Sequence, residues 1–242
     1  MADEGRKTIG VLGGMGPLAT QLFFGMVIDN TEARCDQDHM DMIILNKPSI
    51  SDRTGALLAG ETEPLYRALH SGCAFLAESR AGLIVIPCNT SHVFIDRLRL
   101  EISVPIINMV AEAAGDVRLA KGCGLKVGVL ATDGTVQLGL YGNELEKAGL
   151  LPVYPSEEGQ RRIMRIIYDG IKGGGGVDPD DFAEVDRELR EKGCECAVMG
   201  CTELSCLMQM LDIPRDFYFD AMESLAQKAI LAAGGRLKAR GG

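Results

Sequence analysis

The feature that most constrains the fold is a series of short apolar segments, each followed by a longer segment with helical patterning. The apolar segments do not alternate with polar residues, which is typical of parallel strands covered on both faces. A helix is expected to begin at Pro17, a residue that suits the first helical turn. This order predicts an α/β fold with mostly parallel sheets. The expected strands are residues 8–12, 42–45, 83–86, 104–107, 126–130 and 196–199, and the further helices are residues 61–79, 91–102, 135–147, 157–171, 180–192 and 221–233.

The chain also contains two similar halves. Residues 9–12 (Ile-Gly-Val-Leu) resemble residues 127–130 (Val-Gly-Val-Leu), at an offset of 118 residues. Residues 84–90 resemble residues 197–203, at an offset of 113 residues. Two matches at nearly equal offsets favour an internal duplication.

Composition and charge narrow the functional class. With 242 residues, 46% of them hydrophobic, the chain can bury a sizeable core. A net charge of −9 argues against nucleic-acid binding, which needs a basic surface. No apolar run reaches the roughly 18 residues of a membrane helix, and the charged residues 1–7 lead directly into a strand rather than a signal peptide. We therefore expect a cytoplasmic protein with no membrane or nucleic-acid partner.

A glycine-rich turn, Gly13-Gly14-Met15-Gly16, follows the first expected strand. Glycines between a strand and a helix let a ligand approach the backbone, and these fit a loose dinucleotide fingerprint. That fingerprint also needs a carboxylate at the end of the next strand, where this chain has Leu45-Asn46-Lys47. The turn therefore favours a bound carboxylate over a dinucleotide.

Two cysteines form the stronger candidate site. The chain has eight cysteines, most of which we expect to be reduced and buried. Cys88 and Cys201 differ from the others because each follows an apolar strand and precedes a helix, at matching places in the two halves. Ligands of open α/β sheets bind beyond the carboxyl ends of the strands, and a helix N-terminus lowers a thiol pKa. Asn89, Thr90 and Thr202 follow the two cysteines and can cap the helices or bind a carboxylate.

Two facing thiols suit the inversion of a stereocentre. A base removes the proton from one face of a carbon and an acid supplies a proton to the other, and a thiolate and a thiol can exchange these roles. A hydrolase would instead need a cysteine–histidine pair; His92 lies four residues after Cys88, whereas Cys201 has no histidine near it in sequence. A zinc module is a further alternative, but Cys194, Cys196, Cys201 and Cys206 lack paired zinc-ligand spacing.

One low-complexity segment, Gly173–Gly176, is a flexible loop. It can serve as a linker or as a mobile lid beside a site. The sequence alone leaves both possibilities open.

Taken together, these motifs resemble the aspartate/glutamate racemase family, and within it the aspartate racemases. Residues 9–20 resemble the N-terminal signature of that family, residues 87–92 its first cysteine motif, and residues 200–204 its second. Residues 48–54 resemble a third segment of the family. The second motif departs from the family at Ser205, where a proline is expected after Leu204.

The resemblance implies two pseudo-twofold-related three-layer α/β domains with the active site in the cleft between them. The expected domains are residues 1–112 with 214–242, and residues 113–213. It implies catalytic roles for Cys88 and Cys201, no pyridoxal phosphate or metal, and a homodimer. The implied substrate is aspartate or, as an alternative, glutamate. The substrate-binding residues that it implies are Met15, Arg53, Asn89, Thr90, Lys172 and Thr202.

Other functions stay open at this point. Within the same fold, a hydantoin racemase or a cis–trans isomerase is possible, although Arg53 and Lys172 favour a substrate with two carboxylates. Outside it, a nucleotide-binding or regulatory protein would use the cleft without chemistry.

Overall fold

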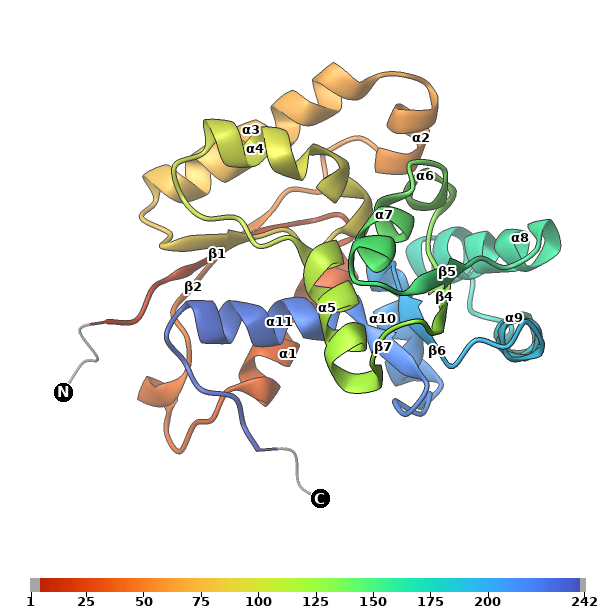
Figure 1. The fold of residues 1–242 in the computed structure, drawn as a ribbon. Coiled ribbons are helices and arrows are strands. Elements are labelled where there is room, and N and C mark those ends of the chain that lie inside the picture. Colours follow the sequence, from red (N-terminus) through yellow and green to blue (C-terminus); the bar gives the residue numbers. More distant parts are fainter. Residues whose placement is uncertain (1–4, 240–242) are drawn as a thin grey trace.

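Two parallel sheets form the centre of the computed structural model, which describes residues 5–239 (Figure 1). The strand order is β2-β1-β3 in the first sheet and β5-β4-β6-β7 in the second. All pairings within the two sheets are parallel. The strands are β1 (Ile9–Gly13), β2 (Met42–Asn46), β3 (Leu83–Val85), β4 (Lys126–Leu130), β5 (Leu151–Val153), β6 (Cys196–Met199) and β7 (Tyr218–Asp220).

Helices cover both faces of each sheet. In the first half they are α1 (Pro17–Asn30), α2 (Arg53–Leu58), α3 (Thr62–Glu78), α4 (Ile95–Glu101) and α5 (Met109–Lys121), with short 3₁₀ helices η1 (Asp36–Asp38) and η2 (Asn89–Phe94). In the second half they are α6 (Asp133–Gln137), α7 (Leu140–Lys147), α8 (Glu157–Arg165), the π-helix η3 (Ile166–Lys172), α9 (Pro179–Glu191), α10 (Thr202–Met210) and α11 (Ala221–Ala232).

Most of the expected strands are confirmed, and one is wrong. Residues 104–107 do not form a strand; Ile106 makes only an isolated bridge to Ile84. Two strands were not expected, β5 and β7, because each has three residues and Pro152 interrupts the apolar pattern of β5.

The expected helices lie at the predicted positions, but three of them are interrupted or change helix type. The helix expected at 135–147 divides at Gly139, whose left-handed φ of 63° separates α6 from α7. The helix at 157–171 continues past Arg165 as a π-helix, and the one at 91–102 begins as the 3₁₀ turn η2. Helices α2 and α5 were not expected.

Alternate residues of the central strands enter different cores. Ile9 and Val11 of β1 share one apolar core with Val127 and Val129 of β4, together with residues of α1, α5 and α11 between the two sheets (Figure 1). The opposite faces of the two sheets pack in separate cores, under α3 and α4 in the first half and under α8, α9 and α10 in the second. The two halves are therefore joined by a common apolar layer.

The C-terminal segment contacts both halves, so the proposed domain boundaries run through a shared region. Strand β7 pairs with β6 in the second sheet, although we expected residues 214–242 to return to the first domain. Helix α11 then packs against α1, α5 and β3 of the first half. The division into 1–112 with 214–242 and 113–213 stays a proposal. Within residues 5–239 no helix is both long and apolar enough to cross a membrane.

The internal repeat extends to packing. Strand order β2-β1-β3 matches β5-β4-β6, and the repeated glycines Gly10 and Gly128 occupy equivalent strand positions. A Cβ at Gly10 would lie 2.8 Å from the Cβ of Ala81, and one at Gly128 would lie 2.7 Å from Leu189. Gly128 thus lets α9 approach its sheet closely, and Gly10 does the same for the end of α3 and the turn that follows it.

The replacement Gly10→Ala tests this close approach. The added methyl group would overlap Ala81 and approach Leu76, so the free energy of unfolding should fall by about 1–3 kcal/mol in urea titrations. The control is Gly115→Ala in α5, where a Cβ meets open space and helix propensity should raise stability by about 0.5–1 kcal/mol. Equal effects of the two replacements would contradict the packing account.

Candidate active site

A narrow cavity lies where the carboxyl ends of strands from both sheets meet, and it has room for about one water molecule. All eight residues that the sequence singled out line it, namely Met15, Arg53, Cys88, Asn89, Thr90, Lys172, Cys201 and Thr202. Five further residues line it that the sequence analysis did not propose as site residues, namely Asp52, Thr54, Thr132, Tyr168 and Glu203. An amino acid would fit only if this cavity widens.

Cys88 occupies the turn between β3 and η2, and His92 holds that turn in place. Nδ1 of His92 lies 3.0 Å from the carbonyl oxygen of Cys88, and Nε2 lies 3.4 Å from that of Ile107. Burial lowers the pKa of His92 to about 4, so the ring is neutral at neutral pH. Both ring nitrogens face backbone oxygens rather than the Cys88 thiol, which is not the arrangement of a cysteine–histidine nucleophile.

Cys201 is the N-cap of α10, and its thiol donates a hydrogen bond to Oε2 of Glu203 at 3.0 Å. The sequence predicted that the helix N-terminus would lower the thiol pKa. The structure shows the opposite: burial and the neighbouring Glu203 carboxylate raise the pKa of Cys201 well above its ordinary value, although Lys172 opposes them. Cys201 is therefore a protonated thiol in this conformation.

Glu203 is the most important site residue that sequence reasoning missed. Its carboxylate is buried, accepts hydrogen bonds from Cys201 and Thr202, and forms an ion pair with Lys172. Burial would lower the pKa of Lys172, but the ion pair with the Glu203 carboxylate leaves that pKa raised, so the lysine stays cationic. A carboxylate two residues after a cysteine, in the first turn of a helix, was the available signal.

Arg53 is the second cation that lines the cavity. Its guanidinium donates to the carbonyl oxygens of Ser51 and Met15, both at 3.1 Å, and Cys88 lies beside it. Burial would lower the arginine pKa, but Cys88, Asp52 and Glu203 leave it raised. Its Nε is buried without a hydrogen-bond partner, as is Nδ2 of Asn89. Such unpaired donors are costly unless a ligand satisfies them.

Three threonines join the two halves next to the first cysteine motif. Oγ1 of Thr90 lies 3.2 Å from that of Thr132 and 2.9 Å from that of Thr135, and these last two lie 3.1 Å apart. All three side chains are buried. Thr90 follows Cys88 in the first half, whereas Thr132 and Thr135 begin α6 in the second, so this cluster fixes the first thiol motif against the opposite half.

The glycine-rich turn supports the site by close packing. The backbone N–H of Gly14 donates to Oγ1 of Thr20 at 2.8 Å, and that hydroxyl donates to the Gly16 carbonyl. With a φ of 92°, Gly14 also lies where a Cβ would overlap the backbone of Lys47 and Pro48. Its N–H is thus satisfied within the protein, and the expected carboxylate ligand finds no free donor at Gly14.

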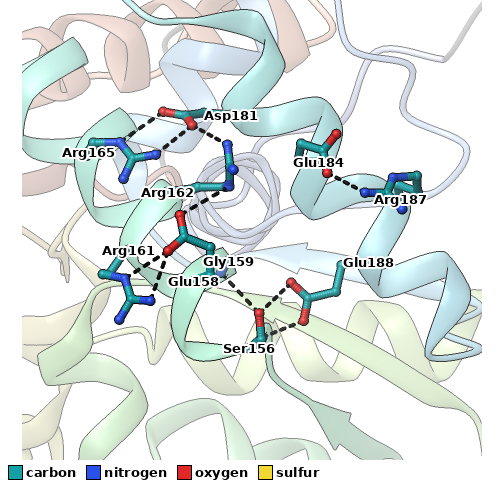
Figure 2. Close-up of polar contacts among 10 residues, drawn as sticks. All are labelled: Ser156, Glu158, Gly159, Arg161, Arg162, Arg165, Asp181, Glu184, Arg187 and Glu188. Carbon is teal, nitrogen blue, oxygen red and sulfur yellow. Dashed lines mark hydrogen bonds and ion pairs between the residues drawn. The ribbon is translucent and has the colours of Figure 1, made fainter.

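Lys172 and Tyr168 line the cavity from η3, and the helix before η3 is tied to α9 by ion pairs. In Figure 2, Arg162 and Arg165 of α8 both pair with Asp181 of α9, at 2.8 and 2.7 Å. The π-helix η3 continues directly from α8, and the hydroxyl of Tyr168 donates to Asp52 of the first half at 3.0 Å. The ion pairs therefore fix the base of the segment whose far end borders the site.

The glycines 173–176 end η3 and turn the chain toward α9. The N–H groups of Gly173 and Gly175 donate to Tyr168 and Asp169, and Gly174 and Gly176 adopt positive φ values. The role of this loop as a lid stays a prediction.

Among residues 5–239, no group of three or more His, Cys, Asp or Glu side chains could hold a metal ion, so the four cysteines 194–206 do not form a zinc site there.

Comparisons with known proteins agree with the geometry. The Asp/Glu/Hydantoin racemase family profile matches residues 12–229. The broad specificity amino-acid racemase of Bacillus subtilis is 31% identical over 166 residues, which are 66% of this chain and 69% of that protein. Among solved structures, an aspartate racemase from Picrophilus torridus superposes with a TM-score of 0.80 and 27% identity over 96% of both chains. An aspartate racemase homologue from Pyrococcus horikoshii gives 0.74 and 25%, over 94% of this chain and 99% of that one.

The burial of His92 generates a pH prediction. Because its pKa falls from 6.5 to about 4 on folding, the unfolded chain binds more protons between these values, and stability is lost as the pH falls through this window. Between pH 7 and pH 5 the His92 contribution to the free energy of unfolding should fall by about 2 kcal/mol.

Urea titrations of His92→Gln at both pH values should lack this component. His70→Gln, at a partly exposed histidine paired with Glu101, is the matched control and should keep it. An unchanged pH dependence in His92→Gln would show that His92 is not buried in its neutral form.

Proposed function

This chain belongs to the Asp/Glu/hydantoin racemase family and is an amino-acid racemase, and we propose that it interconverts L- and D-aspartate without a cofactor. The observation that carries the proposal is that Cys88 and Cys201 line one cavity together with Arg53 and Lys172. Each cysteine follows an equivalent strand of its half of the chain. Glutamate is the alternative substrate, and the broad specificity of the Bacillus subtilis relative makes a panel of amino acids the right test.

The proposed reaction uses the two thiols as base and acid. A Cys88 thiolate beside the Arg53 cation removes the Cα proton, and the electron pair of the broken C–H bond remains on the substrate. The Cys201 thiol then delivers its proton to the opposite face of Cα, which leaves a Cys201 thiolate near Lys172. The reverse reaction exchanges the two roles.

Charge and hydrogen-bond donors around the thiols support substrate binding. Arg53 and Lys172 are the proposed partners of the distal carboxylate, as a guanidinium fork and an ammonium ion. The unpaired Nδ2 of Asn89, together with the hydroxyls of Thr90 and Thr202, are proposed to bind the α-carboxylate and stabilise the charge that develops on it. Because Lys172 is paired with Glu203 here, substrate binding requires that pair to be shared or exchanged.

Racemisation in the absence of added cofactor tests the proposal. Chiral analysis should show D-aspartate formed from L-aspartate, with glutamate, a hydantoin and neutral amino acids as comparison substrates.

Cys88→Ser and Cys201→Ser should each lower kcat by about 10²–10⁴-fold, because each removes the acid or base of one step. Cys123→Ser, at an exposed cysteine outside the cavity, is the control. A Cys201→Ser variant as fast as the unaltered enzyme would contradict the two-thiol mechanism.

The cytoplasmic location of the protein stays a prediction.

We further propose that the protein is a homodimer. The support is an apolar exposed face on α1, where Phe24 and Ile28 lie one turn apart with 43% and 39% of their surfaces exposed. Light scattering should give the mass of two chains, and the double replacement Phe24→Glu with Ile28→Glu should give one. A monomer before replacement would refute the proposal.

A further inference from the structure

We propose that Tyr141 is a positioning residue that sets the two cysteine motifs against each other and orients the Asn89 amide toward the substrate. The proposal rests on the proposed racemase function, because it assigns Tyr141 a role in that same site. Tyr141 does not line the cavity and no sequence motif indicated it, yet it contacts residues next to both thiols.

The hydroxyl of Tyr141 reaches the first motif. Tyr141 belongs to α7 in the second half, is fully buried, and donates to Oδ1 of Asn89 at 2.5 Å. Burial raises the pKa of Tyr141 well above its ordinary value, so the hydroxyl keeps the proton that it donates. Asn89 directly follows Cys88, and the hydrogen bond therefore crosses from one half to the other beside the first thiol.

The ring of the same side chain packs against the second motif. A Cβ at Gly200 would lie 2.6 Å from Cε2 and 3.0 Å from Cδ2 of Tyr141, so the ring occupies the space where any other residue would place its side chain. Gly200 directly precedes Cys201. One rigid aromatic side chain with two rotatable bonds thus contacts both motifs, which suits it to hold their separation.

The direction of the hydrogen bond also determines what Asn89 offers to a ligand. Because Oδ1 accepts from Tyr141, the amide turns its Nδ2 away from the tyrosine. That nitrogen is buried without a partner on a residue that lines the cavity. Without the tyrosine hydroxyl, the amide could rotate and present an oxygen in place of the N–H donors, which would repel a substrate carboxylate.

The test uses Tyr141→Phe, which keeps the ring on Gly200 and removes only the hydroxyl. If racemisation is observed, this variant should raise the KM for aspartate about tenfold with little change in melting temperature. Asn89→Ala should raise it by at least as much. In the Asn89→Ala background, Tyr141→Phe should have no further effect, because its action passes through Asn89. Equal losses in both backgrounds would overturn the proposal.

A second readout does not depend on activity. The ¹⁵N-labelled side-chain amide of Asn89, assigned by its loss in Asn89→Ala, should shift in spectra of Tyr141→Phe. Tyr154→Phe is the matched control, because the Tyr154 hydroxyl lies near Gly142 of the same helix but outside the cavity, and it should leave that signal in place. An Asn89 signal unmoved by Tyr141→Phe would refute the positioning role, whereas a shifted signal in a protein that racemises nothing would refute only the proposed function.

Discussion

Two thiols share one narrow cavity, and different charged side chains lie beside each of them. Cys201 is held as a thiol by burial and by the Glu203 carboxylate that accepts its hydrogen bond, whereas Cys88 lies against the Arg53 guanidinium. Like charges in such a site disfavour each other, so one acid and one base is the stable combination. The proposed inversion of a stereocentre would use Cys201 as the acid, and Glu203, which is neither acid nor base in that proposal, favours the protonated thiol.

The duplicated architecture explains how the chain brings these groups together. Each half supplies a central strand with a close-packed glycine and a later strand that is followed by a cysteine. The apolar layer of α1, α5 and α11 joins the halves, and buried polar contacts between them lie beside the cysteine motifs. Apolar burial holds the two halves together but does not specify their relative orientation. The hydrogen bonds of Thr90 and Tyr141 are directional, so they fix how the two halves are placed.

Sequence patterns predicted the strand–helix order, the repeat and the two cysteine motifs, because those features are local runs or short motifs. The family resemblance, and not a local pattern, added Met15, Arg53 and Lys172 to the expected site. Sequence patterns failed where the structure depends on partners distant in sequence. Strand β7 is three residues long and exists only because it pairs with β6, and the π-helix that presents Lys172 has no separate signature in an amphipathic segment. Glu203 was visible within its motif, but its effect on the Cys201 pKa depends on burial and on Lys172, which lies 31 residues away.

The central claim is that two different groups act on opposite faces of Cα, and the first turnover in heavy water tests it most directly. L-aspartate should be incubated briefly, and both enantiomers separated and analysed for deuterium at Cα. Two thiols predict deuterium in nearly all of the D-aspartate formed and little in the remaining L-aspartate, because the acid that reprotonates Cα draws its proton from solvent rather than from the substrate. D-aspartate that retains the original proton would show a single group acting on both faces and would contradict the account.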